Sequence, residues 1–211
     1  MRFTGSIENI VVAITGASGS CYALRLIECL LDSDRQVSLL ITDAGRQVLK
    51  YETGEDWSKD ENSLQHDLRE LYHSERINCY AIDDFFAPVA SGSAAPDAVV
   101  IVPCSMGTAG RIASGLSENL LERVADVALK ERRDLIMVPR ETPLNQIHLE
   151  NLLRLSRAGA HILPAMPGFY QKPTEIAELV DFVVGKILDS MGIEHALYQR
   201  WGDAPEQDTN E

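Results

Sequence analysis

The sequence predicts a three-layer, Rossmann-like α/β fold in which a mainly parallel sheet is covered by helices on both faces. Short apolar runs rich in β-branched residues alternate along the chain with longer stretches of helical periodicity, an alternation typical of parallel sheets. The first run enters a Gly/Ser turn that opens a helix, as nucleotide-binding βαβ units begin. A length of 211 residues fits one such domain with a single core.

Each expected element follows from this alternation. The apolar runs predict strands at residues 10–14, 37–42, 98–103, 135–138 and 160–165. The periodic stretches predict helices at 18–33, 43–52, 63–74, 105–115, 118–132, 145–158 and 174–191. Segment 53–97 is first acidic and polar and then rich in Gly, Ser, Ala and Pro, so we expect a short helix, an edge strand near 77–82 and a long loop at the active site.

The domain is expected to span 1–211, with flexible ends at 1–8 and 203–211. The chain carries 32 acidic residues against 19 Lys and Arg, a net charge of −13, which repels nucleic acid. No apolar run is long enough for a signal peptide or a membrane span. The four cysteines form no C-x-x-C pair. We therefore expect a soluble, cytoplasmic protein that binds neither nucleic acid nor membrane.

The first turn, Gly16-Ala17-Ser18-Gly19-Ser20, lies between a strand and a helix start, where backbone N–H groups and the helix dipole attract an anion. Its glycines match neither the dinucleotide pattern G-x-G-x-x-G nor the triphosphate pattern G-x-x-x-x-G-K-[ST]. Glycines on both sides of a serine favour close approach of a ligand. The alternative is that Ser18 or Ser20 is a plain helix N-cap.

A second anion site is expected after the strand at 98–103, where "PCSMGT" places Ser105 and Thr108 in the first turn of a helix. Both turns fall at the carboxyl edge of one sheet, and Thr42 ends the second strand at that edge. We interpret the three hydroxyl-bearing turns as the cradle of one mononucleotide. A dehydrogenase is an alternative function, since an acid such as Asp43 after the second strand can bind a ribose hydroxyl. The incomplete glycine pattern argues against it.

Further charged candidates follow the strand at 135–138. Arg140 and Glu141 stand between two prolines at its carboxyl end, which favours a functional role over an ordinary surface ion pair. Arg123 and Lys130 are one heptad apart and share a helix face; a plain solvated face explains them equally well.

Tyr170, in "MPGFYQKP", has an aromatic ring for an apolar pocket and a hydroxyl for a phosphate oxygen, with core filling as the alternative. The five histidines show no metal-binding spacing. "DDFFA" has Ala87 where an Asp-rich magnesium diphosphate motif needs an acid. No metal site is therefore expected.

These motifs resemble those of the UbiX-type flavin prenyltransferases, within the wider family of homo-oligomeric flavin-containing Cys decarboxylase folds. The similarity runs from Ile10 to Trp201 and is carried by "TGASG", "PCSMGT", "NLLERVADVALKERRDLIMVPRETPL", "HLENLLRLSRAGA", "PGFYQKP" and "RWG". It implies a flavoprotein that transfers the dimethylallyl group of dimethylallyl monophosphate to N5 and C6 of reduced FMN. The prenylated FMN would serve UbiD-type decarboxylases, and the enzyme would be a homo-oligomer, by family pattern a dodecamer with sites at subunit contacts.

The resemblance also implies roles for individual residues. FMN would be contacted by Gly16, Ala17, Ser18, Thr42, Ser105, Met106, Gly107, Thr108 and Arg140. The prenyl phosphate would be bound by Tyr170 and Lys186, helped by Arg123, Lys130 and Arg140, with Trp201 as a further active-site position. Ser18, Glu52 and Glu141 would be catalytic. Lys186 departs from the arginine that is common in the family and replaces a bidentate fork by a point charge.

Two other functions remain as alternatives. A flavin-dependent decarboxylase of the peptidyl-cysteine or phosphopantothenoylcysteine type would share the fold, but such relatives have a P-x-M-N segment where this chain has Pro139-Arg140-Glu141-Thr142. A non-catalytic FMN-binding subunit would keep the FMN cradle and have no use for Glu52, Glu141, Tyr170 or the cationic residues.

Overall fold

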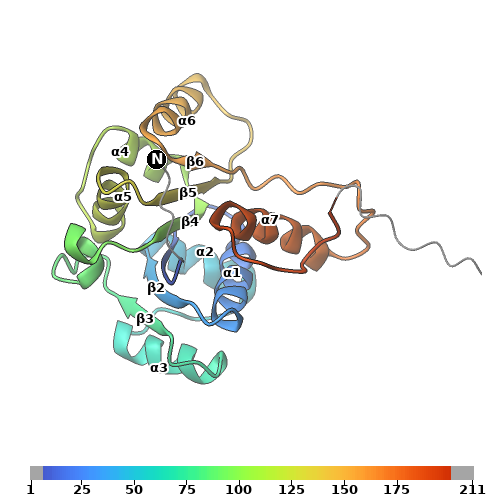
Figure 1. Ribbon diagram of the computed structural model, residues 1–211, viewed down its shortest axis with the longest axis horizontal. Helices are drawn as coiled ribbons and strands as arrows, with labels where there is room; N and C mark the ends of the chain where they lie inside the picture. Colours follow the sequence, from blue (N-terminus) through green and yellow to red (C-terminus); the bar gives the residue numbers. More distant parts are fainter. Residues whose placement is uncertain (1–6, 201–211) are drawn as a thin grey trace, which may run out of the picture.

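The computed structural model describes residues 7–200 and contains a six-stranded parallel sheet flanked by helices (Figure 1). The strand order is β3-β2-β1-β4-β5-β6. The strands are β1 Asn9–Ile14, β2 Gln36–Ile41, β3 Ile77–Tyr80, β4 Ala98–Cys104, β5 Asp134–Pro139 and β6 His161–Ile162. The α-helices are α1 Ser20–Asp32, α2 Asp43–Thr53, α3 Glu61–Leu71, α4 Met106–Ala113, α5 Leu120–Lys130, α6 Gln146–Ala158 and α7 Ile176–Met191. The predicted fold class is confirmed.

The order in which the chain adds strands to the sheet reverses between β1 and β4. From β1 the chain adds strands on one side through β2 and β3, and β4 then returns to pair with the other side of β1. In open parallel sheets the crevice at such a reversal, at the carboxyl ends of the strands, is where nucleotides bind. The Gly/Ser turn after β1 and the Ser-containing turn after β4 lie side by side at this reversal.

Alternate residues of the strands supply two separate cores. On β1, Ile10, Val12 and Ile14 join the core beneath α1 and α7, whereas Val11 and Ala13 join the core beneath α4 and α5. Both cores are fully buried, and each residue of β4 is buried too, as expected for a central parallel strand covered on both faces. The sheet is therefore a rigid base for the loops at its edge.

The predicted strand at 160–165 is wrong in length, since β6 is limited to His161–Ile162. Pro164 has no N–H to donate to a ladder, and the chain beyond it keeps only isolated bonds, from Leu163 N to Met137 O at 2.8 Å and from Ala165 N to Pro139 O at 3.0 Å. The segment stays close to β5 without forming a regular strand.

The predicted active-site loop within 53–97 is also different from expectation. Its second half forms two short 3₁₀ turns, Pro88–Ala90 and Gly92–Ala94, and buries Val89 and Ala90 in the core beneath α5. Arg123 of α5 holds the first turn by donating from Nε to Ala90 O at 3.1 Å. The segment is a packed connection to β4.

At the amino edge, Glu8 lies within the expected flexible end, yet its backbone N–H donates to Asp97 Oδ2 at 3.0 Å. At the opposite end of the chain, an arm projects away from the sheet (Figure 1). It consists of residues 166–175, the first turns of α7 and residues 193–200. Several large apolar side chains are exposed on the arm, among them Met166, Phe169 and Ile176.

Candidate active site

Three loops meet at the carboxyl edge of the sheet, after β1, β2 and β4. A Cβ on Gly16 would lie 2.6 Å from Ala44 Cβ, and one on Gly45 would lie 2.7 Å from Ile14 O, so both glycines are required for the first two loops to touch. Thr42 caps α2 by accepting from Gly45 N at 3.0 Å. Its hydroxyl also donates to Ile14 O at 3.4 Å, which places it beside the end of β1.

Thr15 joins the first loop to the third and was not predicted from the sequence. Its buried hydroxyl donates to Pro103 O at 2.7 Å and accepts from Ser105 N at 2.8 Å. One side chain therefore fixes the spacing of the two turns expected to bind the anion. The sequence shows only a hydroxyl directly after the apolar run 10–14, which does not indicate the partners of Thr15.

The N-terminus of α1 is satisfied by a carboxylate from another helix. Gly19 precedes α1 with a left-handed backbone, φ 111°, and no local side chain caps the helix. Glu52, near the end of α2, accepts from Gly19 N at 3.1 Å and from Ser20 N at 2.8 Å. The plain N-cap suggested for Ser18 or Ser20 is therefore not what the structure shows, and this helix end does hold an anion.

The same contacts set the charge state of Glu52. Partial burial raises the pKa of the carboxyl, but hydrogen bonds from the Ser18 hydroxyl and from the Ser20 and Gly19 backbone outweigh it, so that the pKa of Glu52 lies below its usual value. Glu52 is thus an anion at neutral pH.

The N-terminus of α4 is capped locally. Ser105 Oγ accepts from Thr108 N at 3.3 Å and donates to Thr108 Oγ1 at 3.0 Å. Arg111 donates from Nη2 to the same Thr108 hydroxyl at 3.3 Å and also pairs with the buried carboxylate of Glu122. Burial raises the pKa of Glu122, but hydrogen bonds from Arg111, Glu118 and Asn119 outweigh it and lower the pKa. Within this turn Met106 is buried and Gly107 is exposed.

Arg140 links the edge of β5 to the first loop. Its Nε donates to Ser18 O at 3.3 Å, and its backbone N donates to Cys104 O at 3.3 Å. Glu141 follows it with an exposed side chain that accepts from Thr142 N at 3.1 Å. The structure therefore brings together the first turn, Glu52, the α4 turn and Arg140.

Arg123 and Lys130 are both on α5, which runs antiparallel to the strands. Lys130 is at the end of α5 that precedes β5 and so lies apart from Arg140, which follows the other end of β5. The six residues of β5 separate those two ends by about 20 Å at ~3.3 Å per residue. Arg123 pairs with Asp126 at 3.0 Å, and Lys130 pairs with Glu131.

Tyr170 belongs to the arm, and Lys186 lies beside it on α7. The ring of Tyr170 packs edge to face on Phe182 with centroids 5.8 Å apart, and Lys186 Nζ lies 4.8 Å from the ring centroid of Tyr198. Trp201 lies outside the described residues. Of the residues assigned to the prenyl phosphate, those that the structure describes thus come from α5, from the end of β5 and from the arm with α7.

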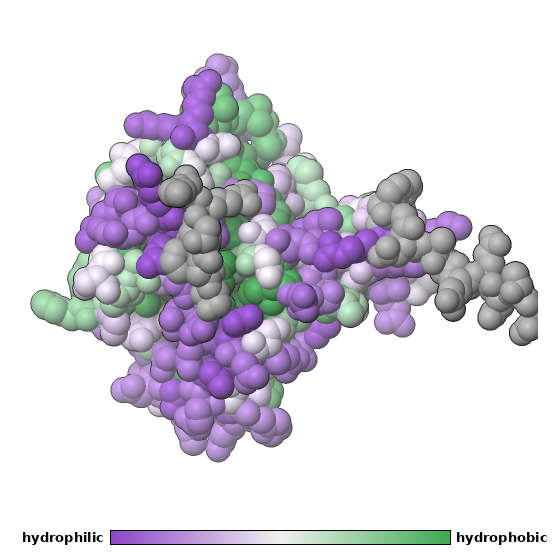
Figure 2. All heavy atoms as spheres, viewed as in Figure 1, coloured by the Kyte–Doolittle hydropathy of each residue, from purple (hydrophilic) through white to green (hydrophobic). Residues whose placement is uncertain are grey.

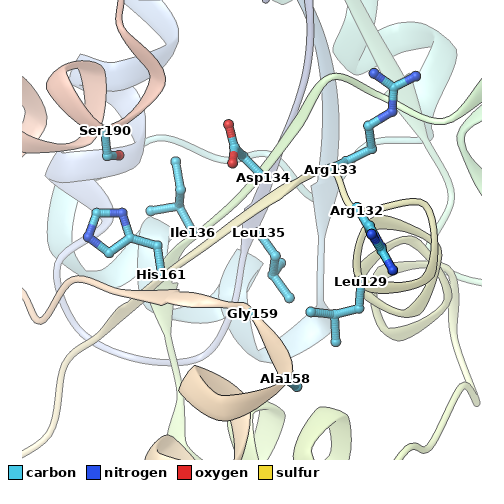
Figure 3. A pocket seen from close by; sticks show the side chains of 10 residues that line it. All are labelled: Leu129, Arg132, Arg133, Asp134, Leu135, Ile136, Ala158, Gly159, His161 and Ser190. Atoms are coloured by element: carbon cyan, nitrogen blue, oxygen red, sulfur yellow. The ribbon is translucent and has the colours of Figure 1, made fainter. Parts of the chain in front are cut away.

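A cavity away from the carboxyl edge of the sheet shows no comparable convergence of loops. This cavity, of about 350 Å³, lies at the amino edge of β5 and β6 (Figure 3), where Arg133 turns toward Asp97 at 3.4 Å and the side chains of Arg132 and His161 point in different directions. Among residues 7–200, no cluster of His, Cys, Asp or Glu could hold a metal ion. Over the same residues, no helix is long and apolar enough to cross a membrane.

Comparisons with known proteins agree with this geometry. The sequence pattern of the family described as Flavoprotein matches residues 4–190. The chain is 51% identical over 199 residues to flavin prenyltransferase UbiX of Halalkalibacterium halodurans, covering 91% of this chain and 92% of that protein. It is 48% identical over 198 residues to flavin prenyltransferase UbiX of Pseudomonas aeruginosa, covering 93% and 95%.

Solved structures extend the likeness to the fold. AnUbiX (PadA1), crystallised with FMN and dimethylallyl pyrophosphate, has a TM-score of 0.84 and 38% identity, covering 94% of this chain and 99% of that one. A dodecameric FMN-dependent UbiX-like decarboxylase from Escherichia coli O157:H7 has a TM-score of 0.81 and 35% identity, covering 91% and 98%. A phosphopantothenoylcysteine (PPC) decarboxylase mutant, at 19% identity and a TM-score of 0.55, shares the fold alone. The chain therefore belongs to the flavoprotein family and, within it, to the UbiX-type flavin prenyltransferases.

Proposed function

We propose that this protein is a flavin prenyltransferase that moves the dimethylallyl group of dimethylallyl monophosphate to N5 and C6 of reduced FMN. The observation that carries the proposal is the meeting of two helix N-termini and Arg140 at one sheet edge, on a chain about half identical to named flavin prenyltransferases. The product, prenylated FMN, would be the cofactor of a UbiD-type decarboxylase.

The loops at the edge suit FMN. Glycine is required at 16 and 19, because side chains there would collide with Ala44 and Tyr22, and the first turn can therefore pack closely at the sheet edge. The Gly19 and Ser20 N–H groups bind the carboxylate of Glu52, so the N-terminus of α4 and Arg140 are the groups that would receive the phosphate of FMN. Thr42, Ser105 and Thr108 supply hydroxyls, Ala17, Met106 and Gly107 supply the walls, and Arg140 supplies a fixed charge.

Transfer from a monophosphate without a metal needs several cations around the departing oxygens. Lys130, Arg140 and Lys186, with Arg123 and the Tyr170 hydroxyl, would provide them. Their separation within one chain supports a site completed by a second copy, so that α5 or the arm of a neighbouring subunit faces Arg140.

The surface fits such an assembly. Figure 2 shows apolar side chains gathered over α6 and its surroundings, where Ile147, Leu149 and Leu153 are each at least half exposed. Further apolar side chains are exposed on the projecting arm. Exposed apolar patches of this kind mark interfaces. We therefore propose a homo-oligomer, and a dodecamer as in the UbiX-like protein of E. coli O157:H7.

Roles for the acids follow from their surroundings. When bound, reduced FMN supplies the nucleophilic positions. We assign to Glu141, exposed at the edge and next to Arg140, the acceptance of the proton released on ring closure, helped by the Ser18 hydroxyl. Glu52 is an anion fixed on the α1 terminus, so we assign it to holding the Ser18 turn and the charge beside it. A cytoplasmic location is proposed from the four cysteines, all of them free thiols.

The decisive experiment is mass spectrometry of the flavin extracted after anaerobic incubation with reduced FMN and dimethylallyl monophosphate. We expect a mass increase of one dimethylallyl unit only when both are present. Unchanged flavin, with tight FMN binding in a parallel titration, would support a non-catalytic FMN-binding subunit instead. Tight binding of NADH and none of FMN would leave a dehydrogenase as the better function.

A further inference from the structure

The last described residues, Ile193–Arg200, form a strap that folds back along α7 and is held by one carboxylate. Asp189 accepts from the Tyr198 hydroxyl, from Arg200 Nη2 at 2.8 Å and from His195 Nε2 at 3.2 Å. His195 Nδ1 accepts from Leu197 N at 3.2 Å, which leaves the proton of the neutral ring on Nε2. Burial raises the pKa of Asp189, but these hydrogen bonds outweigh it and lower the pKa.

The strap lies against α7 at a glycine. Gly185 is buried in the interior of α7, and a Cβ there would be 2.5 Å from Tyr198 Cε1 and 2.7 Å from His195 Cε1. Glycine inside a helix costs about 1 kcal/mol relative to alanine. Gly185 is needed in this helix because the absence of a side chain allows the rings of Tyr198 and His195 to pack against the helix backbone.

The consequence falls on the next residue, Lys186. Its Nζ lies 4.8 Å from the ring centroid of Tyr198 and 5.6 Å from that of Phe182. The two rings are themselves in contact, with centroids 5.3 Å apart. The hydrogen bond with Tyr198 raises the pKa of Lys186 despite its partial burial. The ammonium is therefore charged and lies within cation–π distance of both rings.

The Lys186 ammonium is not simply the cationic partner of a surface ion pair with Asp189. Asp189 Oδ2 is 3.8 Å away, farther than a hydrogen bond, and its lone pairs already receive three other donors. A cavity of about 510 Å³ adjoins Lys186; its walls are mainly apolar, with Leu163, Pro164, Met166, Phe182 and Val183, and also include His161, Asp189 and Ser190. The apolar wall beside the ammonium suits an alkyl chain that ends in a phosphate, and the charge of Asp189 is already engaged by its three donors.

We propose that Tyr198 is a positioning residue that fixes Lys186 for recognition of the donor's phosphate. A lysine ammonium is a mobile point charge, whereas an arginine carries a rigid fork. Tyr198 is itself held by its contacts with Gly185 and Asp189. Its fixed ring therefore restricts the position of the flexible Lys186 side chain. The inference rests on the proposed function, in which Lys186 binds dimethylallyl monophosphate.

The test is calorimetric titration of dimethylallyl monophosphate into the full-length protein loaded with oxidised FMN, in which no turnover occurs. Tyr198→Ala should weaken donor binding about tenfold, within the range of a partly desolvated cation–π contact, and leave the FMN dissociation constant unchanged. Tyr198→Phe, which keeps the ring against Gly185 but loses the hydroxyl contacts with Asp189 and Lys186, should lose less affinity than Tyr198→Ala. Lys186→Arg placed in the Tyr198→Ala protein should recover most of the lost affinity, because arginine brings its own planar fork.

Unchanged donor affinity in Tyr198→Ala would overturn the inference, and so would equal losses of donor and FMN affinity, since those indicate a merely structural role. Should Tyr198→Ala fail to fold, Gly185→Ala displaces the same ring with a single methyl group, and the same loss is expected. If Lys186→Ala itself binds the donor normally, the phosphate role of Lys186 in the proposed function is what fails.

Discussion

Two helix N-termini stand side by side at the carboxyl edge of the sheet, and they are satisfied in different ways. The end of α1 has no local cap and holds the carboxylate of Glu52, which is 33 residues away from Gly19. The end of α4 is capped by its own Ser105 hydroxyl. A carboxylate compensates the positive helix end, whereas a neutral hydroxyl satisfies one N–H and leaves the dipole uncompensated.

The difference indicates how the two ends work. The α1 end takes its compensating charge from α2, and it is already neutralised in the free protein. The α4 end forms with its helix and still attracts negative charge. We therefore expect the phosphate of the flavin to be drawn first to α4 and Arg140, and the α1 turn, with Ser18 and Glu52, to serve the reacting part of the site.

The largest expected effect is on the rate of product formation in Glu141→Gln. It tests whether the site does chemistry beyond binding anions at the two helix N-termini. Glu141 belongs to neither end, and Glu141→Gln preserves its size while removing its charge and basicity. Product formation should fall about 10²–10⁴-fold, the usual loss of a positioned acid or base, while FMN and donor binding stay nearly intact. Anaerobic single-turnover spectra with reduced FMN and dimethylallyl monophosphate measure this.

Glu75→Gln is a matched control, because Glu75 is 84% exposed in an ion pair with Arg69 and such pairs contribute under about 1 kcal/mol. Equal rates of ring closure in wild type and Glu141→Gln would remove Glu141 from the mechanism. A trapped flavin with the prenyl group at N5 alone would place Glu141 in the second bond-forming step.

The second prediction compares the glycines of the two ends. Gly19→Ala forces a side chain into φ 111° and within 2.9 Å of the Tyr22 ring, so the free energy of unfolding should fall by about 1–3 kcal/mol. Gly107→Ala meets no heavy atom closer than Arg111 Nη1 at 3.7 Å, and as a helical position it should gain up to about 1 kcal/mol. Urea unfolding of the FMN-free protein measures both, and a similar loss in both variants would refute the contrast.

The sequence was sufficient to predict the elements that carry these ends. Strands expected at 10–14, 37–42 and 98–103 are found at Asn9–Ile14, Gln36–Ile41 and Ala98–Cys104, because fully buried parallel strands leave an unbroken apolar run. The Ser105 cap was also predictable, since a cap and its helix are neighbours in sequence. The apolar run at 160–165 predicted a longer strand than β6, because Pro164 ends the regular pairing with β5.

What could not be predicted depends on contacts between distant residues. Nothing in the periodicity of α2 indicates that Glu52 reaches the start of α1, and nothing near Thr15 indicates its bonds to Pro103 and Ser105. The pairing of Gly185 with Tyr198 has the same origin. Residue types at one edge were predictable from strand order, whereas their partners were determined by the packing of the helices.

The third prediction is a smaller, pH-dependent difference between wild type and Glu52→Gln. The folded-state pKa of Glu52 is depressed, so its charge stabilises the fold above the unfolded value of about 4.3, and this contribution is lost as the pH falls through the folded pKa. Wild type should be the more stable protein at neutral pH, by under about 1 kcal/mol for a solvent-screened group. The two unfolding curves should converge in acid, and a constant difference from pH 7 to pH 3 would exclude the linkage.

Removal of divalent metal ions is expected to have no effect on the rate of prenylation. Both helix ends and the cations Lys130, Arg140 and Lys186 are the groups proposed to stabilise the departing phosphate, and the described residues contain no cluster of metal ligands. Initial rates of prenylation with EDTA should therefore stay within about twofold of those with added magnesium, whereas loss of a required metal ion would remove several kcal/mol of charge stabilisation. The same assay with Lys186→Ala should lose rate whether or not magnesium is present, since the ammonium acts on the phosphate directly. If magnesium restored the rate of an EDTA-treated enzyme, the phosphate would be held by a metal ion bridging the donor to the protein, and the cationic residues would have to be reassigned to FMN alone.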